Sequence, residues 1–275
     1  EPQTETNWRL ADRYGVPRIA LINKLDRTGA NFARVVAMMA ERLGARPLVM
    51  QLPLGQEAGF EGMIDLVSMQ ALRWPLNGRG QPELTRGAIP EHMLQAARQA
   101  HDALVDTAVE QDDSVLAAYL DGQDVSEAQL RACIRLGALK QAFVPVFAGS
   151  ALKNKGIEPL LDAVVDYLPA PEDRAQALGG GDGFAALVFK VVHDEHGALS
   201  YLRVYRGQAQ AGSMVLNSST GLRERLSRVV QMHANQREEL THAMAGDIVA
   251  VAGLKGSKTG PVSYTHLRAH ETVLD

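Results

Sequence analysis

Two short apolar runs, each followed by a polar turn, constrain the fold of this chain most strongly. The first covers residues 18–22 (R-I-A-L-I) and the second covers residues 142–148 (A-F-V-P-V-F-A). Continuous apolar runs of this length are typical of strands buried in a parallel sheet between layers of helices. Ligands of such α/β sheets bind at the carboxyl ends of the strands. The residues that directly follow each run are therefore candidate ligand-binding residues.

Asn23-Lys24-Leu25-Asp26 follows the first run, and this pattern suits recognition of a guanine base. The Asp26 carboxylate offers two acceptors to the adjacent N1–H and N2–H₂ donors of guanine, whereas adenine would leave the carboxylate unpaired at a large cost in binding free energy. The stem of Lys24 can lie along the face of the base, and Asn23 can tie the loop to a neighbouring loop. Four residues alone are a weak signal, and the alternative is a polar turn after a strand.

Gly149-Ser150-Ala151-Leu152 follows the second run. A small G-S-A turn lets backbone N–H groups approach a ligand closely, in this case the O6 atom of guanine. Two such turns at neighbouring strand ends favour a binding site over a coincidence. We therefore predict a guanine site, without catalytic or metal-binding residues, formed by Asn23, Lys24, Asp26, Ser150, Ala151 and Leu152.

Further stretches extend this pattern in unbroken order over residues 1 to 260. They are N-K-L-D-R-T-G-A-N-F at 23–32, K-N-K-G at 153–156, L-D-A-V-V-D-Y-L-P at 161–169, V-Q-M-H-A-N at 230–235 and A-G-D-I at 245–248. With these stretches the chain resembles the translational GTPases, and within that family elongation factor G. Related factors that act in ribosome recycling, release factor three and the ribosomal protection proteins are the alternatives within the family.

The resemblance and the element pattern together predict an α/β chain with several parts. A partial doubly wound GTP-binding domain carries an inserted α+β subdomain and is followed by a small antiparallel β-barrel. The sheet of the first domain is expected to resume only at the second apolar run. The predicted boundaries are 1–44 and 140–170 for the GTP-binding domain, 45–139 for the inserted subdomain, 171–183 for a linker, 184–260 for the barrel and 261–275 for a non-native tail.

Local signals predict the individual elements. Asn31 and Gly44 are expected to cap one helix, and Ser126 with Gln129 forms a possible capping box for another. The remaining predicted helices cover residues 4–14, 90–111 and 158–168. The predicted strands cover residues 48–54, 63–74, 184–192, 198–205, 213–217, 222–230 and 248–251.

The resemblance also implies a function. The family binds GTP and GDP with Mg²⁺, hydrolyses GTP on the ribosome and promotes the movement of tRNA and mRNA. It implies that the inserted subdomain contacts ribosomal proteins, that the barrel contacts ribosomal RNA, and that tRNA and mRNA are contacted through domains outside this chain. Two other possibilities remain: the inserted subdomain only pads the fold, and the chain is a non-catalytic module that binds the ribosome or a nucleotide.

Two departures from the family pattern matter. The phosphate loop G-x-x-x-x-G-K-[ST] is not found, and residues 256–259 (G-S-K-T) lack its strand–loop–helix context. The family's catalytic histidine would lie upstream of residue 1, so the chain alone is expected to be inactive. At the other end, residues 263–272 resemble a translated cloning adapter, and we exclude residues 261–275 from the expected fold. The alternative is a genuine strand that diverges from the family.

Other candidate sites are weaker. A metal site at His193, Glu195 and His196 is disfavoured because adjacent hairpin residues rarely converge on one ion. Cys133 fits a small core residue better than a reactive thiol. Six arginines suit contact with RNA phosphates, but they also suit a solvated face of alternating charge with Glu224, Glu238 and Glu239. The arginines are Arg203, Arg206, Arg223, Arg225, Arg228 and Arg237.

The overall composition excludes some classes of protein. A formal net charge of −4 argues against a globally basic nucleic-acid binder, and 46% hydrophobic residues allow sizeable cores. Neither a signal peptide nor a long apolar span is present, so a cytoplasmic protein without membrane contact is expected.

Overall fold

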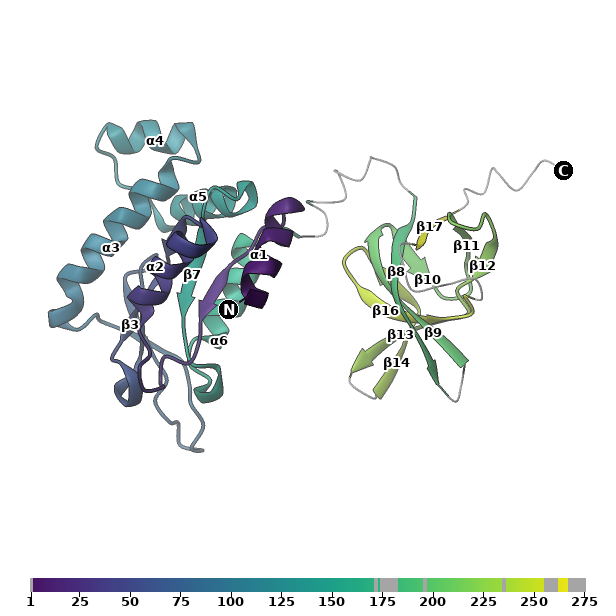
Figure 1. Cartoon of the computed structure of the whole chain (residues 1–275), viewed down its shortest axis with the longest axis horizontal. Helices are drawn as coiled ribbons and strands as arrows, with labels where there is room; N and C mark the ends of the chain where they lie inside the picture. Colours follow the sequence, from purple (N-terminus) through teal and green to yellow (C-terminus); the bar gives the residue numbers. More distant parts are fainter. Residues whose placement is uncertain are drawn as a thin grey trace. The chain divides into compact units, whose positions relative to one another are not determined.

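The computed structural model describes residues 2–170, 173, 183–194, 197–233, 236–254 and 262–266. The chain divides into two compact units, Glu1–Leu168 and Pro169–Asp275. Figure 1 labels many of their elements along the chain. Of the predicted linker 171–183, only Asp173 and Gly183 lie within the described residues.

A parallel sheet of three strands forms the centre of unit 1. Its order is β1 (Ala20–Ile22), β7 (Val144–Ala148) and β2 (Pro47–Val49), and all five residues of β7 are buried. The prediction that the two apolar runs form strands of one parallel sheet is confirmed, because β1 pairs with β7 in parallel. The prediction that the sheet resumes only at the second run is wrong, because β2 also pairs with β7. The predicted start of the inserted subdomain at residue 45 is therefore too early, and the insertion begins after β2.

The chain passes from this sheet into a second one at Met50. The Met50 N–H still donates to the Val146 carbonyl (2.9 Å), but the following residues pair elsewhere. The predicted strand 48–54 is therefore two strands in two sheets. The second sheet is antiparallel, with the order β3 (Gln51–Leu54), β4 (Gly62–Asp65), β5 (Gln70–Arg73) and β6 (Thr85–Gly87).

The predicted strand 63–74 is a hairpin rather than one strand. The Asp65 carboxylate accepts hydrogen bonds from the N–H groups of Val67 (3.4 Å) and Ser68 (3.2 Å), which closes the turn between β4 and β5. Aspartate commonly builds turns in this way. Met69, at φ 52°, completes the reversal.

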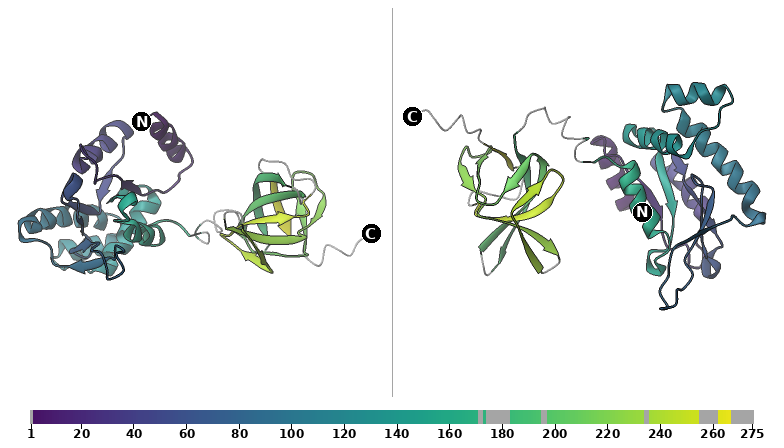
Figure 2. Two further views of the ribbon diagram at one scale, coloured as in Figure 1. Left: turned by 90° about the horizontal axis from the view of Figure 1, so that it is seen from below. Right: turned by 180° about the vertical axis from the view of Figure 1, so that it is seen from behind.

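The α-helices of unit 1 lie around its strands (Figure 2). The predicted caps are confirmed, because the Asn31 side chain accepts from the Arg34 N–H, Gly44 is left-handed at φ 61°, and Ser126 and Gln129 form a capping box. The helices are α1 (Pro2–Arg13), α2 (Phe32–Leu43), α3 (Glu91–Val109), α4 (Asp113–Leu120), α5 (Glu127–Lys140) and α6 (Ile157–Tyr167).

The main core of unit 1 joins α3, α5 and α6 to both sheets. Leu66, Leu104, Ile134 and Phe143 are among its fully buried side chains. Cys133 lies in the same core at 1% exposure, and burial raises the pKa of its thiol. The prediction that Cys133 is a core residue is confirmed.

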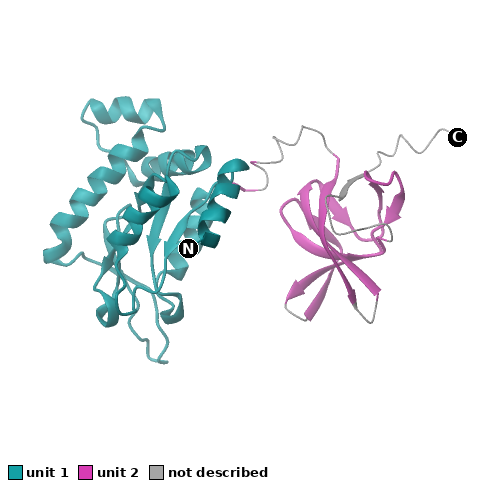
Figure 3. Cartoon of the chain, in the orientation of Figure 1, with its two compact units in different colours: residues 1–168 teal, residues 169–275 magenta. Residues whose placement is uncertain are grey.

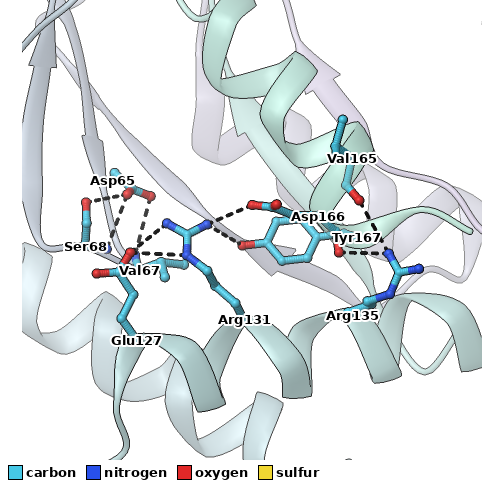
Figure 4. Close-up of polar contacts among 9 residues, drawn as sticks. All are labelled: Asp65, Val67, Ser68, Glu127, Arg131, Arg135, Val165, Asp166 and Tyr167. Atoms are coloured by element: carbon cyan, nitrogen blue, oxygen red, sulfur yellow. Dashed lines mark hydrogen bonds and ion pairs between the residues drawn. The ribbon is translucent and has the colours of Figure 1, made fainter. Parts of the chain in front are cut away.

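Two arginines of α5 fix the C-terminal end of α6 (Figure 4). Arg131 donates to the carboxylates of Glu127 (2.7 Å) and Asp166 (3.0 Å). Arg135 donates to the carbonyls of Asp166 (3.0 Å) and Leu168 (2.9 Å). The last carbonyls of a helix lack partners within the helix, so cationic donors at this end provide the missing hydrogen bonds. Their positive charge also interacts favourably with the negative end of the helix dipole.

Unit 2 consists of antiparallel strands (Figure 3), as predicted. The main sheet has the order β12-β11-β17-β8-β9-β16-β13-β14, and β10 pairs separately with β15. The strands are β8 (Ala185–Asp194), β9 (Gly197–Arg206), β10 (Gln208–Gln210), β11 (Met214–Asn217), β12 (Arg223–Arg225), β13 (Arg228–His233), β14 (Gln236–Leu240), β15 (His242–Met244), β16 (Ile248–Ala252) and β17 (Val262–His266).

The predicted strand 222–230 is split in the structure into β12 and β13. Leu226 and Ser227 lie between them, and their N–H groups donate to Ser213 and Ala252 respectively (both 2.9 Å), so the chain changes partners here. Within the described residues, β12 and β14 each have one hydrogen-bonded neighbour, and a closed barrel therefore stays a prediction.

The end of the sheet brings one correction. β17 pairs with both β8 and β11, so the exclusion of residues 261–275 from the fold is wrong for Val262–His266. Serine, tyrosine and threonine in this stretch include good strand formers, which explains why it can extend a sheet. That residues 261–275 are non-native stays a prediction. Across the described part of the chain, we find no helix with the length and apolar character needed to cross a membrane.

Candidate guanine-binding site

The two polar turns predicted from the sequence leave the parallel sheet at the same edge. We call residues 23–29 the first loop and residues 149–156 the second loop. Ile22 and Ala148 are opposite each other in the parallel register of β1 and β7. The Gly149 N–H donates to the Ile22 carbonyl (3.1 Å), and the Leu25 N–H donates to the Gly149 carbonyl (3.2 Å). The sheet therefore brings the two loops into direct contact.

Asp26 and Ser150 are joined by their side chains. The Ser150 hydroxyl, which is fully buried, donates to Oδ1 of the half-buried Asp26 (2.7 Å). This hydrogen bond is the main reason that the pKa of Asp26 lies below its ordinary value, with smaller contributions from Arg27 and Lys153. The carboxylate is therefore ionised at neutral pH and held in one orientation.

Asn23 joins the two loops through the backbone. Its Oδ1 accepts from the N–H groups of Ala151 (2.9 Å) and Lys24 (2.7 Å). The prediction that Asn23 ties its loop to a neighbouring loop is confirmed. Lys24 adopts a left-handed conformation at φ 63°, and its side chain is exposed, while the next residue, Leu25, anchors the loop in the core.

The second loop is closed by Ser150 and Lys155, whose N–H and carbonyl groups pair with each other (3.0 Å each). Leu152 projects from this loop at 77% exposure, and Ala151 is also exposed. An open pocket of about 530 Å³ lies between the two loops, and its lining includes Asp26, Leu152, Lys153 and Lys155. The lining combines charged side chains with the apolar side chains of Leu152 and Phe60, and of the six predicted site residues only Asp26 and Leu152 line it.

The sequence interpretation missed the β3–β4 loop, residues 55–61, which touches both loops of the site. Glu57 Oε1 accepts from the Gly29 N–H (2.8 Å), and Lys155 Nζ donates to the Phe60 carbonyl (2.6 Å). No motif indicated Glu57, whose partner Gly29 lies 28 residues away along the chain.

The structure describes only one residue of the disfavoured metal site. His193 lies on β8, whereas Glu195 and His196 fall outside the described residues. Among the residues that the structure describes, no group of three His, Cys, Asp or Glu side chains is placed to hold a metal ion.

The basic character of β12 in unit 2 is less interrupted by acidic side chains than the sequence suggests. Glu224 turns inward at 8% exposure and accepts a hydrogen bond from Asn217 Nδ2 (3.1 Å). Its neighbours Arg223 and Arg225 remain exposed. Glu239 does lie near Arg228 (3.8 Å), so part of the alternating charge persists.

We expect Ser150→Ala to raise the pKa of Asp26, because the substitution removes the strongest interaction that favours the carboxylate. The stabilisation from this hydrogen bond is fully present above the ordinary pKa of an unfolded aspartate, about 3.9, and is lost as pH falls through the lower folded-state pKa. Titration of the Asp26 carboxyl carbon by NMR measures the shift. An unchanged midpoint in Ser150→Ala would contradict this account.

Comparison with known proteins identifies the family. Residues 1–170 match the family model of the elongation factor Tu GTP-binding domain. The chain belongs to the elongation factor Tu GTP-binding domain family. Residues 183–261 match the model of elongation factor G domain 2. The two matches confirm the resemblance to the translational GTPases, and to elongation factor G in particular.

Individual relatives agree with this family. Elongation factor G of Anaplasma phagocytophilum (strain HZ) is 50% identical over 94% of this chain and 40% of its own length. Elongation factor G 2 of Hahella chejuensis (strain KCTC 2396) is 47% identical over 100% of this chain and 43% of its own length. A crystal structure of a protein from Thermus thermophilus is 26% identical with a TM-score of 0.82, covering 96% of this chain and 38% of that one. The chain thus spans about two fifths of the length of the curated relatives it matches.

Proposed function

We propose that this chain forms the guanine-recognition half of the nucleotide site in an elongation factor G, the GTPase that promotes movement of tRNA and mRNA on the ribosome. The observation that carries the proposal is the contact between the two loops. Ser150 orients the Asp26 carboxylate, and Asn23 binds the Ala151 N–H. A polar turn without a ligand does not require these two contacts between strand ends.

Each residue of the site has a separate part in the proposed recognition of GTP or GDP. Asp26 accepts from N1–H and N2–H₂ of guanine, and the Lys24 stem lies along the base. Because the Ala151 N–H is engaged by Asn23, the donor to O6 is the N–H of Leu152, in the short 3₁₀ turn η2 (Ala151–Lys153). The first N–H groups of a helical turn point out of it and suit a carbonyl acceptor.

The rest of the proposed activity belongs to the longer protein that the relatives represent. Phosphate binding, Mg²⁺ and hydrolysis are assigned there, since the sequence of this chain contains no phosphate loop. We assign contacts with ribosomal proteins to the subdomain inserted between β2 and β7. Unit 2 is proposed to be a small barrel whose exposed Arg223 and Arg225 contact ribosomal RNA phosphates, in a cytoplasmic protein.

An NMR titration with nucleotides tests base recognition in this chain directly. GDP should shift the backbone amide signals of Asp26 and Leu152, whereas ADP at the same concentration should not, because adenine leaves the Asp26 carboxylate without donors. Asp26→Ala should abolish the response to GDP. Equal responses to GDP and ADP would refute the proposed function.

A further inference from the structure

The β3–β4 loop binds the first loop at two points, on either side of Asp26. The Glu57 N–H donates to the Leu25 carbonyl (3.1 Å), and Glu57 Oε1 accepts from the Gly29 N–H (2.8 Å). Leu25 directly precedes Asp26 and Gly29 follows it by three residues. One glutamate thus fixes the backbone on both sides of the aspartate that is proposed to bind guanine.

The same β3–β4 loop also contacts the second loop of the site. Lys155 Nζ donates to the Phe60 carbonyl (2.6 Å) and lies 5.7 Å from the centre of the Phe60 ring. Phe60 is buried in a core of unit 1, so the carbonyl and the ring that Lys155 contacts are held in place. The β3–β4 loop therefore connects the two loops through contacts separate from the Asp26–Ser150 hydrogen bond.

The backbone of the β3–β4 loop is held in an unfavourable conformation. Glu57 has a φ of 51°, a left-handed value that is costly for a residue with a side chain. Gly55 turns the chain just before it at φ 82°, and a Cβ atom there would lie 1.9 Å from the Gly59 carbonyl oxygen. A glycine at position 57 would relieve the strain but would lose the carboxylate that binds Gly29.

We propose that Glu57, together with Lys155, is a positioning residue for guanine recognition. Glu57 holds the first loop, which carries Asp26, at a fixed distance from the Ser150–Leu152 turn of the second loop. Because Glu57 lies between β3 and β4, the second sheet contributes in this way to the recognition of the base. The inference rests on the proposed function. It goes further, because it assigns a specificity role to a residue of the β3–β4 loop that does not itself touch the base.

Substitutions of Glu57 in the full chain test this role. Glu57→Ala removes the acceptor and should raise the dissociation constant for GDP about tenfold, whereas Glu57→Gln keeps an acceptor oxygen and should stay within about twofold of the parent chain. Glu61→Ala is the matched control. Glu61 is an exposed carboxylate of the same loop, and its ion-pair partner is Arg73 at 3.8 Å. This control should leave the dissociation constant unchanged.

A second measurement separates positioning from simple destabilisation. Inosine diphosphate lacks the N2 amino group, so the ratio of GDP to inosine diphosphate affinity reports how well Asp26 is placed. Glu57→Ala should lower this ratio by about threefold or more, and amide hydrogen exchange at Gly29 should become faster. A general loss of stability would lower both affinities equally and leave the ratio unchanged, which would overturn the inference.

The outcomes also separate this inference from the function on which it rests. If Asp26→Ala binds GDP as well as the parent chain does, the proposed function fails. If Asp26→Ala loses binding while Glu57→Ala retains both affinity and ratio, only the role of Glu57 fails. If Glu57→Ala does not fold, Lys155→Met supplies the second variant: a lowered ratio supports the inference and an unchanged ratio overturns it.

Discussion

Replacing Asp26 by asparagine should shift the preference of the site from guanine towards xanthine by roughly 30- to 1,000-fold. In the proposed site, the Asp26 carboxylate presents two acceptors to two donors of guanine. An asparagine presents one acceptor and one donor, so its N–H₂ group would face the N2 amino group of guanine. Xanthine carries a carbonyl at C2, which accepts from that amide instead.

Competition binding with GTP and xanthosine triphosphate, on the parent chain and on Asp26→Asn, measures this change as a ratio of affinities. Asp121→Asn is the matched control, because it removes the same charge from an exposed residue at the end of α4. If Asp26 belongs only to a polar turn, both nucleotides should respond equally. An unchanged ratio would show that Asp26 does not contact the base.

Phe143→Ala should destabilise unit 1 by about 3–5 kcal/mol, because it empties a large volume in the core. Phe143 is 2% exposed, and its ring packs so closely on α5 that a Cβ atom at Gly137 would lie 2.1 Å from Cζ. The space cannot be filled by a small movement of α5, since that helix also holds α6 through Arg131 and Arg135.

Urea denaturation followed by tryptophan fluorescence measures the effect of Phe143→Ala on unit 1 alone. Both tryptophans of the chain, Trp8 and Trp74, lie in this unit. Phe189→Ala, at an exposed position of unit 2, should leave the fluorescence transition in place. A transition that moves equally in the two variants would contradict the assignment of Phe143 to the core of unit 1.

The predictions that the structure confirms depend on interactions that a few residues of sequence can reveal. The caps Asn31 and Ser126 bind N–H groups three residues away, so their signal is contained in a few residues of sequence. The contact between Asn23 and Ala151 was also predictable, although 128 residues separate them. Two parallel strands that are neighbours in a sheet must bring their ends together, and each strand could be recognised by itself.

The predictions that failed concern where a strand changes its partner. Residues 47–54 are predominantly apolar, and nothing local marks Met50 as the point where one sheet ends and another begins. The same holds at Leu226, which is fully buried and lies between β12 and β13. Partner changes depend on which strands are available in three dimensions, and this information is absent from a hydrophobic pattern.

Glu57 shows a different limit of the sequence. A glutamate in a polar loop has no distinguishing pattern, and its function as an acceptor depends on the left-handed backbone of the β3–β4 loop. Asp65 is the opposite case. Its hydrogen bonds with the N–H groups of Val67 and Ser68 are local, so this turn could have been predicted from the sequence.

The 124 residues that separate Asp26 from Ser150 have a consequence for folding kinetics. Closing a loop of this length costs conformational entropy before any favourable contact has formed, and contacts between residues distant in sequence form slowly. The second sheet and helices α3, α4 and α5 lie within that loop, so their collapse shortens the effective distance between the two ends. We therefore expect the proposed base pocket to assemble late in folding, so that a guanine nucleotide would stabilise the finished unit rather than guide its early stages.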